Sequence, residues 1–514
     1  MTTQRPPFPF KKFDNPESIN RYVSGQKDVV SKIRASSKKV IILSAPTGVG
    51  KSLIAMMCGN YMAHTTNYIC TTKVLQNQLE NDFKEAVIMK GRVNYQCNKF
   101  WTKGNNVMAD DCVSRCIDVK KGIITCDYED AKSAMMSSKY RILNTAYWLT
   151  EINYVGKLSG QKLVVIDEVD RLDSQTVSFV GLVISKSDIY KYGLKPPIHM
   201  TKVESWKDWG KKTYVIVDKK FPGSMKKEER DKEIVKGYRF KRKVVMFNSL
   251  VDDTWIFEKT KFGSWVFKPI WISKELGQEY IWKHADKFIL MSATPPMPSS
   301  IGLNNKDVEM IEIESSYPVE NRWVYYNGVV DMSYKNRKNH SDILPHVQNI
   351  MDKFKDKKGI IHTCSYKLRD MVMNSNVDVD RFVTHDASNK EEKMKEFLAD
   401  KTNKIFLSPS SERGTNLIYD KGRFCIWLKV PFGNLGDKQI AARAYSKPFG
   451  SEWYIRDAMQ TIVQGCGRVM RADDDWGFSY ILDSQFGSVE SRKRSVMSYC
   501  PEWFLKGLIV GSGL

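Results

Sequence analysis

The amino-acid sequence predicts an α/β protein with two parallel-sheet lobes and two insertions in the first lobe. Three observations predict this fold class. Short apolar runs recur along the chain, helix-like stretches separate several of them, and the runs form one group before about residue 300 and another after about residue 320. Strands that alternate with helices are typical of parallel sheets with helices on their faces.

The runs that we expect to be strands are apolar at successive positions, as buried parallel strands are. They span residues 40–43, 163–166, 288–291, 359–361, 405–407, 424–428 and 480–482. Helix-like stretches that separate some of these runs span 52–62 and 73–83, and we expect helices there. The segment 301–321 is expected to link the two lobes.

Two stretches interrupt the alternation of strands and helices and predict the domain organisation. Residues 91–135 hold a cluster of cysteines, and residues 173–285 are rich in Lys, Trp and Tyr. We expect both to be insertions. The predicted division is 1–90 with 136–172 and 286–300 for the first lobe, 91–135 and 173–285 for the insertions, and 316–514 for the second lobe.

Composition narrows the class of protein. The 514 residues are 42% hydrophobic and 27% charged, which argues against a mostly disordered, collagen-like or fibrous chain. A net charge of +21 points to a polyanionic partner, with nucleic acid as the default and a basic surface that aids solubility as the alternative. Ten cysteines are too few for a disulfide scaffold. We expect no membrane span and no secretion signal.

The strongest motif is a glycine-rich loop between an expected strand and an expected helix. Glycines let the backbone curl so that its N–H groups face phosphate oxygens, and the helix adds its positive end. Within it, Lys51 would reach the β- and γ-phosphates and Ser52 would hold Mg²⁺. The alternative is a chance glycine turn. The loop consists of Ala45, Pro46, Thr47, Gly48, Val49, Gly50, Lys51 and Ser52.

Two further motifs supply acids and arginines. The expected strand 163–166 ends in Asp167 and Glu168, where Asp167 would bind Mg²⁺ and Glu168 would deprotonate the attacking water. Residues 464–471 place Arg468 and Arg471 three apart, so both lie on one side of a helical turn. Guanidinium groups stabilise the charge on a transferred phosphoryl group. The alternative is a surface helix with two solvated arginines.

In this order the motifs resemble those of superfamily 2 helicases, and more narrowly the XPD/DinG family of iron–sulfur helicases, from about residue 15 to 485. Residues 45–52 resemble motif I, 292–294 the Ser-Ala-Thr motif, 412–416 motif V and 464–471 motif VI. Asp167 to Asp170 resembles the DEAH box, with Val and Asp in its last two positions, so the His that normally helps to couple ATP to DNA is missing. Position 413 also departs from the family pattern.

The resemblance implies two RecA-like lobes that bind ATP and Mg²⁺ between them. Gln26 would read adenine, and Gly414 would lie in the nucleotide site. The first lobe would contribute Lys51, Ser52, Asp167 and Glu168, and the second Gln464, Arg468 and Arg471.

Four cysteines, Cys97, Cys112, Cys116 and Cys126, lie within about thirty residues. Four thiolates hold either a 4Fe–4S cluster or tetrahedral Zn²⁺. Spacing alone favours zinc, because Cys112 and Cys116 suit a zinc knuckle. Their place between motifs I and II, and their flanks, resemble the cluster domain of the XPD/DinG family and imply a 4Fe–4S cluster.

Nucleic-acid contacts are expected where basic residues mix with aromatics. In the cysteine insertion these are Lys99 and Trp101. In the second insertion, which corresponds in position to the family's arch domain, they are Lys211, Lys212, Lys241, Arg242 and Lys243. Residues Thr71, Thr72 and Gln76 resemble motif Ia, a backbone-contacting element. The alternative for each aromatic is core packing.

Together these features predict an ATP-dependent DNA helicase that translocates on single-stranded DNA, 5′ to 3′ by resemblance, and unwinds duplexes. We expect a monomer that binds single-stranded and forked DNA, has no nuclease activity, and works in the cytoplasm or nucleoid, or in a host cell if it is viral. The alternatives are a translocase that remodels protein–DNA complexes, an RNA helicase, and a non-catalytic nucleic-acid-binding protein. The pathway and protein partners are not predicted.

Overall fold

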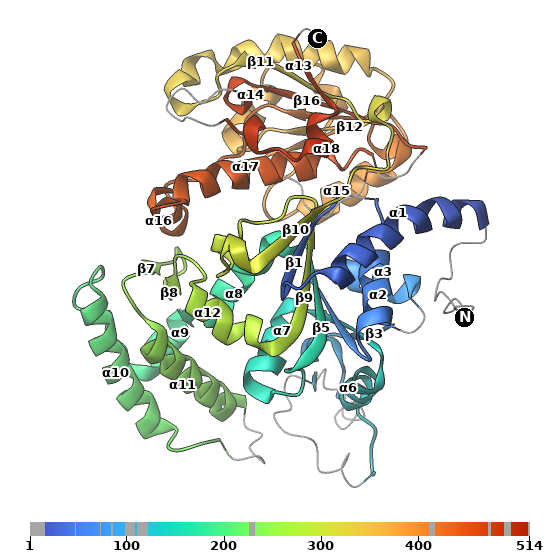
Figure 1. Ribbon diagram of the computed structural model, residues 1–514. Coiled ribbons are helices and arrows are strands. Elements are labelled where there is room, and N and C mark those ends of the chain that lie inside the picture. Colours follow the sequence, from blue (N-terminus) through green and yellow to red (C-terminus); the bar gives the residue numbers. More distant parts are fainter. Residues whose placement is uncertain are drawn as a thin grey trace, which may run out of the picture. The chain divides into compact units, whose positions relative to one another are not determined.

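The computed structural model describes residues 16–46, 48–71, 73–83, 86–97, 108–109, 122–225, 232–410, 417–470, 474–487 and 495–511 (Figure 1). It divides into two compact units, Met1–Leu43 with Ser52–Ile311 and Ser44–Lys51 with Glu312–Leu514. The short segment Ser44–Lys51 joins the second unit because Ile313 N donates a 2.8 Å hydrogen bond to the carbonyl oxygen of Ser44.

The first unit is built on a seven-stranded sheet with the order β10-β1-β9-β5-β2-β4-β3. The neighbouring pairs from β9 to β3 are parallel, as the sequence predicts. The sequence does not predict strands β2, β3 and β4; β2 and β4 contain polar residues, whereas β3 is the short apolar run Ala-Val-Ile-Met. The strands are β1 (Val40–Ser44), β2 (Thr66–Cys70), β3 (Ala86–Met89), β4 (Tyr140–Asn144), β5 (Gln161–Asp167), β9 (Ala285–Ser292) and β10 (Val308–Glu312).

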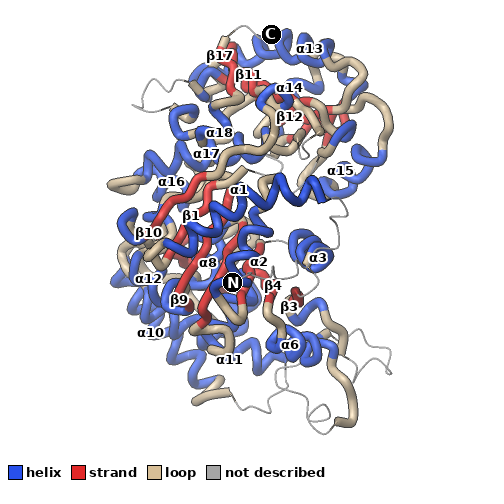
Figure 2. The backbone as a smooth tube through the Cα atoms, turned by 45° about the vertical axis from the view of Figure 1, so that its right-hand side comes forward, coloured by secondary structure: helices blue, strands red, loops and turns tan. Residues whose placement is uncertain are grey.

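Helices cover this sheet (Figure 2). Helix α2 buries an apolar stretch that includes Ile54 and Met57, and its Gly59 lets β2 approach closely, because a Cβ there would lie 2.5 Å from Thr66 Oγ1. Trp148 and Phe288 are fully buried in the core on the sheet. The helices are α1 (Pro16–Ala35), α2 (Lys51–Met62), α3 (Lys73–Asp82), α6 (Asp127–Ser137), α7 (Thr145–Thr150), α8 (Leu172–Val180) and α12 (Lys274–Tyr280).

Part of the segment that we expected to link the two lobes forms a strand. Residues 308–312 within the segment 301–321 form β10, the edge strand beside β1. Its sequence, Val-Glu-Met-Ile-Glu, mixes apolar and acidic residues; Ile311 is buried and Met310 is half-exposed, which is typical of an edge strand with one solvated face.

The second insertion folds around a core of its own. Helices α10 (Val203–Lys220) and α11 (Lys232–Leu250) pack with a three-stranded antiparallel sheet in the order β6-β8-β7. Trp206 and Trp209 are buried there, and Trp209 Nε1 donates a 2.8 Å hydrogen bond to the carbonyl oxygen of Lys195. The other elements are α9 (Lys186–Tyr192), β6 (Leu182–Ile184), β7 (Trp255–Lys259) and β8 (Trp265–Pro269).

The second unit holds another seven-stranded sheet, with the order β13-β14-β12-β15-β16-β11-β17 and every neighbouring pair parallel. The two predicted α/β lobes are therefore confirmed. Its strands are β11 (Val324–Val330), β12 (Gly359–His362), β13 (Phe382–Thr384), β14 (Ile405–Ser408), β15 (Phe424–Trp427), β16 (Phe478–Asp483) and β17 (Leu508–Val510). Its helices are α13 (Leu344–Lys353), α14 (Tyr366–Met373), α15 (Lys390–Ala399), α16 (Lys438–Tyr445), α17 (Gly450–Cys466) and α18 (Glu502–Leu505).

No helix within the described ranges combines the length and the apolar character that crossing a bilayer requires.

Candidate active site

The glycine-rich loop leaves β1 and runs into the first turn of α2. Gly48 and Gly50 have φ values of 90° and 75°, a left-handed conformation that favours glycine. A Cβ at Gly48 would overlap the ring of Tyr317, so this position has no room for a side chain. Lys51 Nζ donates hydrogen bonds to the carbonyl oxygens of Ala45 (3.0 Å) and Pro46 (2.9 Å), which places the ammonium group over its own loop. The loop is thus shaped as a phosphate cradle requires; Thr47 lies outside the described residues.

The buried carboxylate of Asp167, at the end of β5, is held at both oxygens. Oδ1 accepts a 2.9 Å hydrogen bond from the backbone N–H of Glu168, and Oδ2 accepts a 2.8 Å bond from the hydroxyl of Tyr68. The same hydroxyl lies 3.2 Å from Ser52 Oγ, at the start of α2. Ser52 and Asp167 therefore converge on one point. Hydroxyl and carboxylate oxygens are ligands that Mg²⁺ prefers, so these residues fit the predicted magnesium site.

Glu168 has a backbone conformation that is rare for residues other than glycine. Its φ of 48° and ψ of 47° lie in the left-handed region, which turns the chain sharply after β5. Its half-buried carboxylate accepts a hydrogen bond from the hydroxyl of Thr71, directly after β2. Strain of this kind persists where surrounding contacts fix it, and functional sites are a common place for it. The hydroxyl of Tyr68 in β2 thus donates to Asp167, and that of Thr71, the residue after β2, donates to Glu168.

A third contact joins the acidic segment to the end of β9. Ser292 Oγ donates a 3.0 Å hydrogen bond to Asp170 Oδ1, and it accepts a 3.1 Å bond from the backbone N–H of Thr294. These are the residues that resemble the Ser-Ala-Thr motif and the last position of the DEAH box. The two motifs therefore meet through side chains in the first unit.

The remaining predicted nucleotide residues are described only in part. Gln26 is buried on α1, and Gln464 lies in the last turn of α17. Arg468 follows that helix, is buried, and has its carbonyl oxygen bonded to the N–H of Leu417 at 3.1 Å. Gly414 and Arg471 lie outside the described residues. Their roles stay predictions.

The cysteine insertion is described at its two ends. Cys97 and Cys126 are half-buried, and Cys112 and Cys116 lie outside the described residues. The ends meet through an edge-to-face contact between Tyr95 and Tyr128, with ring centroids 5.6 Å apart. Among the residues described, which include two of the four cysteines, no three His, Cys, Asp or Glu side chains form a group that could hold a metal ion.

Several residues expected to contact nucleic acid are engaged inside the protein. Gln76 is fully buried and donates a 3.4 Å hydrogen bond to the carbonyl oxygen of Met89. Lys241 is buried, pairs with Asp218, and donates to the carbonyl oxygens of Phe221 (2.9 Å) and Gly223 (2.7 Å). Burial keeps the side chain of Gln76 from solvent, and the ammonium group of Lys241 already has three partners within the fold, so neither residue is placed to contact nucleic acid in this structure.

The next two basic residues of α11 also contact the protein, although Arg242 is exposed and Lys243 is half-buried. Lys243 donates to the carbonyl oxygen of Phe179, and burial, with the nearby charge of Arg242, lowers the pKa of Lys243 to about 8. Arg242 lies with Cζ 3.7 Å from the centroid of the Tyr154 ring. Lys211 and Lys212 are exposed on α10. Thr72, Lys99 and Trp101 lie outside the described residues.

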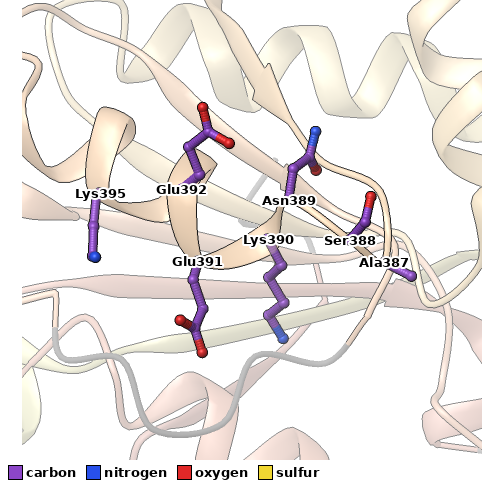
Figure 3. Close-up of a pocket in the computed structure, with 7 residues that line it drawn as sticks. All are labelled: Ala387, Ser388, Asn389, Lys390, Glu391, Glu392 and Lys395. Atoms are coloured by element: carbon purple, nitrogen blue, oxygen red, sulfur yellow. The ribbon is translucent and has the colours of Figure 1, made fainter. Parts of the chain in front are cut away.

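A hollow of about 590 Å³ lies at the start of α15 in the second unit (Figure 3). No residue of the predicted motifs lines it. Lys390 Nζ there is 3.3 Å from Ser410 Oγ. The hollow therefore adds nothing to the candidate site. Its lining residues are Ala387, Ser388, Asn389, Lys390, Glu391, Glu392 and Lys395.

Comparisons with known proteins agree with this geometry. Residues 23–186 match the family model of the DEAD/DEAH box helicase, and residues 347–503 match that of the helicase C-terminal domain. A search of curated proteins finds no match.

Solved structures share the fold. An XPD helicase structure is 17% identical, covers 91% of this chain and 96% of its own, and has a TM-score of 0.58. An XPD apo structure has 16% identity, 90% and 96% coverage and a TM-score of 0.56. S. tokodaii Xpd4 has 13% identity, 92% and 98% coverage and a TM-score of 0.55. At these identities the likeness concerns the fold.

Proposed function

We propose that this chain, an ATP-dependent superfamily 2 helicase with an XPD-like fold, moves 5′ to 3′ along single-stranded DNA and opens duplex DNA ahead of it. The observation that carries the proposal is the meeting of Ser52, Asp167 and Glu168 around the hydroxyls of Tyr68 and Thr71. A hydrolytic site of this kind needs a metal-binding carboxylate beside a second carboxylate that is free to take a proton from water.

Each residue of the site would have a distinct role in ATP hydrolysis. The backbone of the loop 45–52 would bind the phosphates, with Lys51 on the β- and γ-phosphates. Ser52 and Asp167 would hold Mg²⁺, which when bound neutralises phosphate charge. Glu168 would orient the attacking water and accept its proton.

The second unit would complete the reaction. Arg468 and Arg471 are proposed to stabilise negative charge on the transferred phosphoryl group, an effect that reaches about 10³–10⁵ in rate for arginine fingers. The Asp170–Ser292 hydrogen bond is proposed to couple hydrolysis to movement on DNA, because it links the segment that follows the acids to the end of another strand.

A cluster domain is part of the proposal. Cys97, Cys112, Cys116 and Cys126 would hold a 4Fe–4S cluster that keeps a small insertion rigid at the DNA fork. The resemblance of the flanks supports this. The contact between Tyr95 and Tyr128 brings the two ends of the insertion together, as a cluster bound by cysteines from both ends requires.

The deciding experiment is strand displacement by the full chain, purified without oxygen, on matched duplexes that carry a 5′ or a 3′ single-stranded tail. Unwinding of the 5′-tailed duplex alone is expected. Unwinding of the 3′-tailed duplex alone would keep the motor and overturn the polarity. No unwinding, with ATPase activity still stimulated by single strands, would favour a translocase. Comparing stimulation by DNA and by RNA tests the choice of nucleic acid.

A further inference from the structure

Tyr68 lies in the middle of β2, and its side chain is fully buried. Its hydroxyl is 2.8 Å from Asp167 Oδ2 and 3.2 Å from Ser52 Oγ. A phenol has one proton and can also accept a hydrogen bond. Both contacts are satisfied when Tyr68 donates to Asp167 and accepts from the hydroxyl of Ser52.

The register of the sheet explains how Tyr68, which lies outside the motifs, reaches both Ser52 and Asp167. Strand β2 lies beside β5 in parallel register, with Tyr68 opposite Val165, two residues before Asp167. Residue 68 projects to the same face as Thr66, which lies against Gly59 of α2. The phenol therefore extends along the face on which α2 begins with Lys51 and Ser52.

The arrangement leaves the Asp167 carboxylate with a donor at each oxygen, Tyr68 at Oδ2 and the Glu168 N–H at Oδ1. Residues that hydrogen-bond to metal ligands fix the orientation of those ligands, and the loss of such a residue typically lowers metal affinity about 10–100-fold. Because one hydroxyl hydrogen-bonds to both Ser52 and Asp167, it would set the spacing between their oxygen atoms before the metal binds.

We propose that Tyr68 is a positioning residue that orients Ser52 and Asp167 for magnesium, so that it sets the metal affinity of the nucleotide site without touching the nucleotide. The inference rests on the proposed function, because it assumes that Ser52 and Asp167 hold the metal of a nucleotide complex. None of the motifs described above includes Tyr68.

The test is Tyr68→Phe, which removes the hydroxyl and keeps the ring. Mn²⁺ serves as the probe, and its binding to the ADP-loaded full chain is followed by electron paramagnetic resonance. We expect the variant to bind Mn²⁺ about 10-fold or more weakly. Affinity for ADP in the presence of EDTA should stay within about twofold of wild type, since the phosphate loop is unchanged. The Mg²⁺ concentration for half-maximal ATPase activity should rise by a similar factor.

The matched control is Tyr140→Phe. Tyr140 is also buried, on β4 beside β2, but its hydroxyl donates to the backbone carbonyl oxygen of Met56 at 3.3 Å and not to an acid. This variant loses a buried hydroxyl of the same sheet and should bind Mn²⁺ like wild type. Equal losses in both variants would show a general packing effect and overturn the inference.

Two further outcomes separate the inference from the proposed function. Unchanged Mn²⁺ affinity in Tyr68→Phe, or an equal loss of ADP affinity in EDTA, would overturn the positioning role and leave the helicase proposal standing. Weakened Mn²⁺ binding in Tyr68→Phe by a chain that binds ADP but hydrolyses no ATP would support the positioning role and overturn the proposed hydrolysis.

Discussion

The hydroxyl of Ser292 donates a 3.0 Å hydrogen bond to the carboxylate of Asp170, and this bond connects the end of β9 with the turn after β5. Position 170 is where the DEAH box has a histidine, so here a carboxylate makes the contact with the Ser-Ala-Thr motif. A hydrogen bond to an ionised acceptor is stronger than one between neutral groups. The loss of the histidine therefore does not leave the two motifs disconnected.

Removing this bond should separate ATP hydrolysis from movement. We expect Ser292→Ala to lower the rate of strand displacement about tenfold, while ATPase activity without nucleic acid stays within about twofold, because the acids and the phosphate loop are unchanged. Stopped-flow displacement and a phosphate-release assay measure the two rates. Ser300→Ala, which removes a buried hydroxyl that donates to the carbonyl oxygen of Met297 in its own turn, is the control. An equal fall in both rates would show that the bond serves the hydrolytic step.

Glu168→Gln tests the proposed base. The amide keeps the size of the side chain and can still accept from Thr71, but it cannot take a proton from water. A general base typically contributes about 10²–10⁴ in rate, so a loss of that order in kcat is expected. Binding of a fluorescent ATP analogue should stay within about threefold of wild type. Retention of DNA-stimulated ATPase activity would remove Glu168 from this role.

The cysteine insertion is open to chemical analysis. The full chain, purified without oxygen, should contain about four iron atoms and four acid-labile sulfides per molecule, as a 4Fe–4S cluster requires. Cys97→Ser and Cys126→Ser should each lose most of the iron, whereas Cys58→Ala, at a buried thiol of α2, should keep it. One zinc atom per chain with no sulfide would instead support the zinc alternative.

The seven strands expected from the sequence are all present because each is an apolar run buried on both faces, a signal that needs no tertiary context. Strand β2, Thr-Asn-Tyr-Ile-Cys, lacks that signal, although it lies between β5 and β4 in the sheet. One of its polar residues makes a specific contact, because the hydroxyl of Tyr68 donates a hydrogen bond to Asp167. Such a role becomes visible only when the fold brings β2 beside β5.

The sequence alone also does not show which of the expected DNA-contacting basic residues face solvent. A run such as Lys241 to Lys243 has charge but no periodicity that shows which side faces water. The structure buries Lys241 beside Asp218 and turns Lys243 to a backbone carbonyl, so their charges stabilise the insertion. Trp206 and Trp209 are likewise core residues of the insertion, and Trp209 Nε1 donates a hydrogen bond to the carbonyl oxygen of Lys195.

Lys211 and Lys212 therefore become the sharper test of nucleic-acid binding by the second insertion. Both are exposed on α10, and Lys212 makes an exposed ion pair with Asp208 at 2.7 Å. Replacing both with Ala should weaken binding of single-stranded DNA and reduce the slope of log affinity against log salt by about two. Fluorescence anisotropy at several salt concentrations measures this. Lys355→Ala with Lys357→Ala, an exposed pair in the second unit, controls for net charge. Equal slopes in all three proteins would place the DNA elsewhere.

Asp483, at the end of β16, links stability to pH in the second unit. It is almost fully buried and accepts backbone hydrogen bonds from Val430 (2.8 Å), Gln485 (3.0 Å) and Met332 (3.1 Å). Burial nevertheless raises the pKa of Asp483 from 3.8 to about 6. Between these values the folded chain binds more protons than the unfolded chain, so the stability from this group is full below pH 3.8 and falls as the pH rises towards 6.

Asp483→Asn removes this titration, because an amide does not ionise. Between pH 4 and pH 7 the free energy of unfolding of wild type should therefore fall relative to that of the variant, by up to about 3 kcal/mol for a shift of about two pKa units. Urea unfolding at several pH values measures the difference. Asp331→Asn should change it in the opposite direction: burial tends to raise the pKa of Asp331, but hydrogen bonds from Ser333 and Gln485 outweigh burial and lower it, so wild type loses that stabilisation as the pH falls. A constant difference between wild type and Asp483→Asn would show that the Asp483 carboxylate is hydrated in the folded chain.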